Sequence, residues 1–296
     1  MTVTASGTVD PLRYGNLTIV PASKVLGAEI KGVDLNNVDD ATYRRIRNAW
    51  IDNLVLLFRK QNIGDAELVA FSRLFGELDM APPQENGLQA VADQPEIMVI
   101  SNVKEGGLPI GSLGDGEAIW HSDMNYAEYP PLGSALFSLE IPDMGGNTGF
   151  CNMYMALDAL PSDLRTKLEG KSIKHDASMT SGGYLRQGMD EVTDVSQCPG
   201  AIHPIIRNHP ESGRSVLYLG RRLNAYIMDM PIDESEALLD EVWQYTTREN
   251  HTWHHQWQVG DVVLWDNRAV MHRRDAFDPG QRRIMHRTQI ADRPGA

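Results

Sequence analysis

The hydrophobic positions in the first third of the chain alternate between helical and strand spacing. Apolar residues recur at helical intervals in two segments, and Gly76 follows the second as a stop signal. Short, nearly continuous apolar runs lie before and between them, bounded by Pro21 and Gly27. The expected helices are 41–53 and 65–75, and the expected strands are 17–20, 28–30 and 53–58.

From about residue 95 the pattern changes to many short apolar runs separated by turns rich in Gly and Pro, such as Gly145-Gly146-Asn147. The expected strands are 97–100, 134–139, 203–206, 216–219, 256–258, 262–265 and 284–290. Two amphipathic helices interrupt them, at 155–168 and 233–246, and Asp233 with Glu236 resembles a capping box. Many short strands with such turns predict a mainly β sandwich or closed barrel with flanking helices.

A single domain is the expected organisation. The 296 residues could fill two average domains, but no repeat, low-complexity tract or linker divides the chain. The first fifteen residues are small and polar. We therefore expect a flexible tail at 1–15 and one domain at 16–296.

Charge and composition narrow the range of partners. Lys and Arg total 27 against 40 Asp and Glu, a net charge of −13, which argues against nucleic acid as a partner. No apolar run is long enough to span a membrane and no signal peptide is recognisable, so no membrane role is expected. Cys151 and Cys198 are expected to be isolated thiols in a reducing, cytoplasmic setting.

Candidate chemistry lies in two segments, Trp120 to Asp123 and Trp265 to His272. His121 and Asp123 are two residues apart, so on a strand they would share one face and could bind one metal ion. His272, arriving from a distant strand, would complete a set of two imidazoles and one carboxylate, which suits Fe(II) and leaves positions free for cosubstrate and oxygen. A His-x-Asp pair alone is common by chance, so a metal site needs support from other residues of the chain.

Thr148 and Arg283 supply such support, because they lie 25 residues beyond Asp123 and eleven beyond His272. A guanidinium can bind a carboxylate through two parallel hydrogen bonds, and a threonine hydroxyl can add a third. A carboxylate clamp close to iron is what a 2-oxo acid cosubstrate requires.

With these residues, the sequence resembles the TauD/TfdA family of Fe(II)- and 2-oxoglutarate-dependent dioxygenases. The matching motifs span about residues 16–291: Val25 to Ile30, Leu57 to Gln61, Phe75 to Leu78, His203 to Arg214, Trp265 to Arg268 and Arg283 to Arg287. The resemblance implies a double-stranded β-helix, or jelly roll, with helices outside. It also implies that His121, Asp123 and His272 bind iron, that Thr148 and Arg283 hold the distal carboxylate of 2-oxoglutarate, and that O2 is consumed. By the same analogy, a homo-oligomer, either dimer or tetramer, is expected.

Substrate residues are also suggested by the resemblance. Arg287 matches an arginine that binds an anionic substrate group in family members acting on sulfonates or carboxylates. Strand alternation would place it in the same cavity as Arg283. The alternative is a structural ion pair.

The chain departs from the taurine-specific members of the family. Their polar substrate contacts correspond to Ala81, Gln84 and Glu117 here, and an aromatic contact corresponds to Leu223, beside Arg221-Arg222. A different small acid is therefore expected: an aryloxyalkanoate, another sulfonate or carboxylate, or an amino acid whose ammonium Glu117 would pair. The alternative for Glu117 is a solvated loop carboxylate.

The predicted activity is hydroxylation of a C–H bond with succinate and CO2 as co-products. Hydroxylation next to a heteroatom would cleave a C–O or C–S bond. Two alternatives from other classes are a non-catalytic jelly-roll binder of an acidic ligand and a Zn-dependent hydrolase, which would need neither the Thr148/Arg283 clamp nor oxygen.

Overall fold

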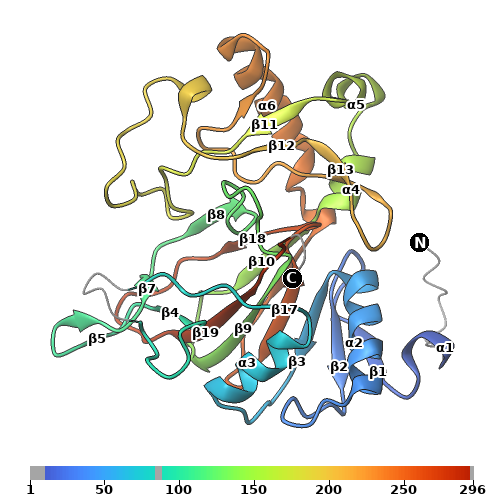
Figure 1. Ribbon diagram of the computed structural model, residues 1–296, viewed down its shortest axis with the longest axis vertical. Helices are drawn as coiled ribbons and strands as arrows, with labels where there is room; N and C mark the ends of the chain where they lie inside the picture. Colours follow the sequence, from blue (N-terminus) through green and yellow to red (C-terminus); the bar gives the residue numbers. More distant parts are fainter. Residues whose placement is uncertain (1–10, 84–88, 294–296) are drawn as a thin grey trace.

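Two β-sheets packed face to face form the centre of the molecule (Figure 1). The computed structural model describes residues 11–83 and 89–293. In spatial order the large sheet contains β1 (Thr18–Pro21), β2 (Ala28–Lys31), β3 (Val55–Phe58), β17 (Val262–Asp266), β9 (Gly133–Glu140), β19 (Ile284–Ile290), β4 (Met98–Ser101) and β7 (Ser112–Leu113). The small sheet contains β16 (Thr252–His255), β10 (Thr148–Asn152), β18 (Val270–Arg274) and β8 (Ala118–His121).

The central strands of the large sheet are buried on both faces, which explains why β3, β17 and β9 read as nearly continuous apolar runs. On β17, Val263 and Trp265 join the core that lies between the two sheets. Val262 and Leu264 face the opposite way, into a second core under the helices. Those helices are α2 (Asp40–Asn53) and α3 (Asp65–Arg73), which lie beside β3 in Figure 1. The period of two along each strand thus divides its side chains between two cores.

A further layer covers the small sheet on the other side. It contains α4 (Met153–Asp158), α5 (Ser162–Leu168), α6 (Ile232–Thr246), the strands β12 (Ile202–Pro204), β11 (Ser172–Lys174) and β15 (Tyr226–Ile227), and the pair β13 (Ile206–Asn208) and β14 (Ser215–Leu217). Smaller elements are the hairpin β5 (Lys104–Glu105) and β6 (Leu108–Pro109), and two 3-10 turns, Val195–Gln197 and Glu249–His251. Apolar residues of α4, α5, α6 and β11 belong to the same buried cluster as the core between the sheets. The core between the sheets therefore continues into this outer layer.

The predicted mainly β architecture with outer helices is confirmed, but four local predictions are wrong. The expected strand 203–206 is divided between β12 and β13, which belong to different sheets. The expected helix 155–168 is two helices, because Pro161 ends the first and caps the second. Pro231 rather than Asp233 caps α6, with no side-chain hydrogen bond. The expected strand at 256–258 lies instead at 252–255.

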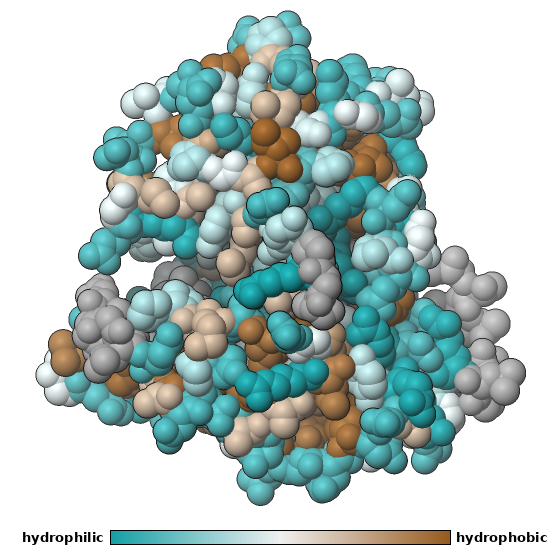
Figure 2. All heavy atoms as spheres, in the orientation of Figure 1, coloured by the Kyte–Doolittle hydropathy of each residue, from teal (hydrophilic) through white to brown (hydrophobic). Residues whose placement is uncertain are grey.

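The start of the described chain is more ordered than expected. Helix α1 (Pro11–Tyr14) falls within the predicted tail 1–15, and Arg13 and Tyr14 both donate hydrogen bonds to Asp52 of α2. Residues 1–10 lie outside the described residues. Among the residues described, no helix has the length and apolar character needed to cross a membrane. Hydrophilic side chains cover much of the face shown in Figure 2, with smaller apolar groups between them.

Candidate functional site

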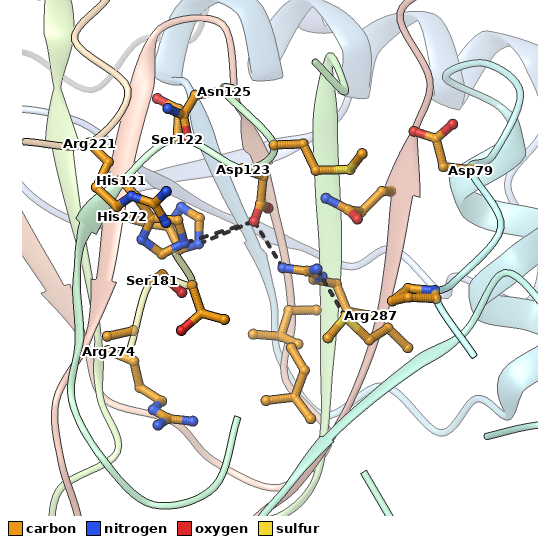
Figure 3. Close-up of a pocket in the computed structure, with 18 of the residues that line it drawn as sticks. Asp79, His121, Ser122, Asp123, Asn125, Ser181, Arg221, His272, Arg274 and Arg287 are labelled. Carbon is orange, nitrogen blue, oxygen red and sulfur yellow. Dashed lines mark hydrogen bonds and ion pairs between the residues drawn. The ribbon is translucent and has the colours of Figure 1, made fainter. Parts of the chain in front are cut away.

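His121, Asp123 and His272 meet between the two sheets, as the sequence predicts (Figure 3). His121 on β8 is paired directly with His272 on β18, and their rings lie 4.2 Å apart. Asp123 lies in the turn that follows β8. The Nε2 atom of each imidazole is 3.9 Å from Oδ1 of Asp123. One ligand atom from each residue falls within 4.8 Å of the others, so a single metal ion could bridge them.

Hydrogen bonds from surrounding residues fix the orientation of His121 and Asp123. Nδ1 of His121 is 2.7 Å from the Ile119 carbonyl oxygen, which can only accept, so Nδ1 carries the proton and Nε2 offers its lone pair. Asn267 accepts a hydrogen bond from the Asp123 backbone N–H and donates to the Asp123 carbonyl. Ser134 donates to Oδ2 of Asp123, leaving Oδ1 toward the histidines. Such second-layer contacts hold metal ligands in a fixed geometry.

The turn between β17 and β18 fixes where His272 lies. Asp266 is fully buried and accepts hydrogen bonds from His209 and from the backbone and guanidinium of Arg268. Burial alone would raise the pKa of Asp266, but Arg268 and His209 hold it well below its usual range. The paired charges rigidify the hairpin that presents both Asn267 and His272 to the site.

The protonation states of the three residues favour metal binding. Burial lowers the pKa of His272 to about 3, and burial also lowers the pKa of His121. Burial would raise the pKa of Asp123, but Arg287 and the two imidazoles outweigh it and bring the pKa to about 2. At neutral pH the set is therefore two neutral imidazoles and one carboxylate. Those are the forms that bind a divalent ion, and the donor set is that of non-haem Fe(II).

Thr148 and Arg283 lie in the same cavity, and both fit a carboxylate ligand. Thr148 is on β10, next to β18, and its Oγ1 accepts a 3.0 Å hydrogen bond from Trp257, so its hydroxyl proton remains free to donate. Arg283 precedes β19 on the facing sheet and is only 2% exposed. Burial, followed by the neighbouring charge of Arg274, lowers the pKa of Arg283 to about 9.

The Arg283 guanidinium has no counter-charge in the residues described. Among the residues that the structure describes, the guanidinium forms no ion pair and no hydrogen bond, and its Nε is buried without a partner. Burying an unpaired charge is costly, so such a group marks a place where an anion binds. The residues present therefore fit the distal carboxylate of a 2-oxo diacid.

Arg287 lines the cavity and also forms an ion pair. Its side chain lines the cavity, as alternation along β19 predicts, while His286 points away and contacts Asp65. Its Nη1 donates to Oδ1 of Asp123 at 3.0 Å, so it is also an ion-pair partner of the candidate metal ligand. A group bound by Arg287 would consequently lie close to the metal.

The cavity around these residues has a volume of about 490 Å³, within the range of small-molecule sites. Apolar side chains of Met98, Ile100, Leu136 and Trp265 form part of its lining. Among the lining residues described, six are arginines and two are aspartates, which is the reverse of the charge balance of the whole chain. The arginines are 186, 221, 274, 283, 287 and 293, and the aspartates are Asp79 and Asp123.

Glu117 does not join this site. It is 52% exposed, forms a 3.0 Å ion pair with Arg273, and is absent from the residues that line the cavity. The side chain therefore behaves as the surface carboxylate that was the alternative. Ala81 is buried between two lining residues, Met80 and Pro82, and Gln84 lies outside the described residues.

Replacing Glu117 by glutamine should leave the KM for the primary substrate within about twofold of wild type, because its side chain lies outside the cavity lining and pairs with Arg273 at the surface. Steady-state kinetics at saturating cosubstrate would measure this. An increase of tenfold or more would restore a substrate role for Glu117.

Sequence reasoning gave no role to three residues of the site. Asn267 clamps the Asp123 backbone, Trp257 orients Thr148, and Arg221 lines the cavity. Asn267 belongs to the Trp265–Arg268 motif, so its position was a usable signal. Trp257 and Arg221 reach the site only through long-range packing.

Comparison with known proteins agrees with this geometry. The family model described as "Taurine catabolism dioxygenase TauD, TfdA family" matches residues 18–289. The (S)-phenoxypropionate/alpha-ketoglutarate-dioxygenase of Sphingobium herbicidovorans is 32% identical, over 94% of this chain and 96% of that protein. The alpha-ketoglutarate-dependent 2,4-dichlorophenoxyacetate dioxygenase of Cupriavidus pinatubonensis is 31% identical, over 92% and 96%.

A solved structure is equally similar. The crystal structure of a taurine dioxygenase from Burkholderia xenovorans superposes with a TM-score of 0.76 at 31% identity, covering 94% of this chain and 90% of that one. The predicted jelly-roll fold and the resemblance read from the sequence are confirmed. The chain belongs to the TauD/TfdA family of Fe(II)- and 2-oxoglutarate-dependent dioxygenases.

Proposed function

We propose that this protein hydroxylates a C–H bond of a small acidic substrate, with Fe(II), 2-oxoglutarate and O2 as cofactor and cosubstrates. In this proposal His121, Asp123 and His272 hold the metal, Thr148 and Arg283 bind the distal carboxylate of 2-oxoglutarate, and Arg287 binds the acid group of the substrate. The observation that carries it is the buried Arg283 guanidinium, which has no ion-pair partner among the described residues and lies in the same cavity as the His-Asp-His set.

Iron and 2-oxoglutarate together supply the oxidising chemistry, in which O2 is consumed, 2-oxoglutarate becomes succinate and CO2, and a hydroxyl enters the substrate. The chain contributes position and environment. Arg283 and Thr148 anchor the far end of the cosubstrate, and Arg287 anchors the substrate beside Asp123. The apolar walls at Met98, Leu136 and Trp265 exclude water from the reacting groups.

An aryloxyalkanoate is the substrate class that we favour. The two relatives described above are named for phenoxypropionate and 2,4-dichlorophenoxyacetate. The apolar part of the cavity would accept an aromatic ring, and Arg287 would accept the carboxylate. Hydroxylation at the carbon next to the ether oxygen gives a hemiacetal, which collapses with cleavage of the C–O bond.

The test is a panel of aryloxyalkanoates, sulfonates and amino acids assayed for coupled succinate release with Fe(II), 2-oxoglutarate and O2. Succinate release and oxygen uptake that depend on one of these acids are the expected result. Oxygen-independent hydrolysis after loading with Zn²⁺ would instead indicate the metal-assisted hydrolase. Tight binding of an acid with no turnover under any condition would indicate the non-catalytic binder.

Replacing Arg287 by glutamine should lower kcat/KM for the acidic substrate about 10- to 100-fold, because a hydrogen bond to a charged group contributes about 1.5–3 kcal/mol. Arg287→Lys should recover part of the loss. Since Arg287 also contacts Asp123, metal affinity must be titrated in parallel. An unchanged substrate KM with normal metal loading would rule out anchoring.

Two further proposals concern setting and assembly. Both cysteines are free thiols, which supports a reducing, cytoplasmic location. A dimer or tetramer is proposed by analogy with the family, and light scattering after size-exclusion chromatography would test it.

A further inference from the structure

Arg221 is a buried arginine of the cavity to which the proposed function gives no role. It lines the cavity and is only 3% exposed. The segment that carries it runs antiparallel to the metal-ligand segment: Ser122 donates to the Gly220 carbonyl at 3.0 Å, and Arg221 forms a backbone bridge with His121. Its position beside the metal site is therefore fixed by the backbone.

Gly220 makes this approach possible. Its φ is +64°, in the left-handed region, and a Cβ atom there would lie 2.5 Å from Asn125 Nδ2 and from His175 Nδ1. Only glycine lets the chain turn this tightly against its neighbours. The turn brings the Arg221 side chain to the wall of the cavity.

The Arg221 guanidinium is only partly satisfied by the protein. Nη2 donates to the Asp176 backbone carbonyl at 2.8 Å, and Nε is buried without a partner. In the part of the chain that the structure describes, no carboxylate lies within ion-pair distance of it. The nearby Asp176 carboxylate accepts instead from Ser178 and Asn224. Burial lowers the pKa of Arg221, which reflects how incompletely its charge is compensated.

A second arginine extends this wall. Arg186 also lines the cavity; its guanidinium lies 4.4 Å from the centre of the Tyr126 ring, and its Nε donates to the Met179 carbonyl. The hydroxyls of Thr180 and Ser181 line the same cavity. We call Arg186, Arg221, Tyr126, Thr180 and Ser181 the 186/221 subsite.

The cavity arginines separate into those with an assigned partner and those without. Arg293 pairs with Asp79, Arg287 with Asp123, and Arg283 is proposed to bind 2-oxoglutarate. Arg274 hydrogen-bonds to the carbonyls of Gly114 and Gly116. The two cations of the 186/221 subsite remain without an acidic ion-pair partner among the described residues. Figure 3 shows Arg221 beside the histidines and Arg287 on the other side of Asp123.

We propose that the 186/221 subsite binds a second anionic group of the primary substrate, so that the substrate is a small dianion, such as an aryloxyalkanoate with a second acid group on its ring, a dicarboxylate or a sulfonated carboxylic acid. This proposal rests on the proposed function, because Arg287 is taken to hold the first acid group. A guanidinium that lacks a counter-charge binds an oxyanion through short, charge-assisted hydrogen bonds. A monoanion would leave Arg221 buried and uncompensated.

Binding is the first test, because it does not require turnover. Protein loaded with Mn(II) and saturated with 2-oxoglutarate, under anaerobic conditions, is titrated calorimetrically with two matched pairs: phenoxyacetate with 4-carboxyphenoxyacetate, and hexanoate with adipate. At least one dianion should bind tenfold or more tighter than its monoanion. Arg221→Gln should remove that advantage while changing monoanion affinity less than threefold.

The matched control is the neighbouring residue. Arg222 lies outside the cavity lining and pairs with Glu236 and Asp240 of α6, so Arg222→Gln should keep the dianion preference intact. If Arg221→Gln does not fold, Arg186→Gln should reduce the preference in the same direction, and Arg221→Lys should retain part of it.

The proposal is overturned if neither dianion binds tighter than its monoanion, or if Arg221→Gln weakens both members of a pair equally. Succinate release decides the proposed function separately. If a monoanion drives succinate release and no dianion is preferred, only the proposal of the subsite is contradicted. If the dianion preference depends on Arg221 but no acid causes succinate release, only the proposed function is contradicted.

Discussion

Replacing His272 by alanine is expected to reduce substrate-dependent succinate formation at least 1,000-fold, which corresponds to about 4 kcal/mol of lost transition-state stabilisation. The two imidazoles and Asp123 Oδ1 are the clustered donors in the described residues, so the loss of one leaves two protein ligands. Metal affinity should fall with activity, and His121→Ala should behave in the same way. The measurement is succinate formation together with Fe(II) binding.

His254→Ala is the control for that experiment. His254 is 44% exposed on β16 and lies outside the cavity lining, so its removal should leave both iron binding and turnover intact. Wild-type turnover that survives exhaustive iron chelation would overturn the metal assignment. Turnover that persists without oxygen would also contradict the dioxygenase.

Replacing Arg283 by methionine should weaken the binding of 2-oxoglutarate without destabilising the unliganded protein. Truncating one partner of a buried charge pair costs about 2–5 kcal/mol, so the Kd for 2-oxoglutarate should rise about 30- to several thousand-fold. The unliganded protein should be no less stable, because the substitution removes a buried charge that has no counter-ion among the described residues. Calorimetric titration of 2-oxoglutarate and thermal unfolding of the unliganded protein measure the two effects.

Arg282→Met is the matched control for Arg283. Arg282 is 54% exposed and pairs with Glu140 on the surface, so its loss should leave 2-oxoglutarate affinity unchanged. A normal Kd in Arg283→Met would contradict the clamp. A strongly destabilised unliganded protein would show instead that the guanidinium has a structural role.

The parts of the site that sequence could predict are those determined by local periodicity. Arg283 and Arg287 were placed in one cavity because alternate strand positions share a face, and the structure shows both lining it. His121 and Asp123 follow the same local rule even though Asp123 lies just beyond the strand. Family motifs then connected these segments to His272, far along the chain.

What the sequence could not predict depends on packing between distant segments. Arg221 enters the cavity because Gly220 lets its backbone bond beside His121, and nothing near Arg221 in the sequence indicates that neighbour. Glu117 corresponds to a substrate contact of the taurine-specific members only through a loop, where a shift of one or two residues changes which side chain faces inward. The expected helix across Pro161 was a local error, because proline at that position should have ended it.

Strand β18 also limits how this enzyme can diverge. His272 and Arg274 face the cavity, whereas Arg273 between them points outward to Glu117. Inserting or deleting one residue inside β18 would exchange the two faces and present the wrong side chain to the metal, even if the backbone pairing with β10 and β8 re-formed. Substitutions can therefore retune this strand stepwise, while changes of length are tolerated only outside it, as in the loop from 275 to 282.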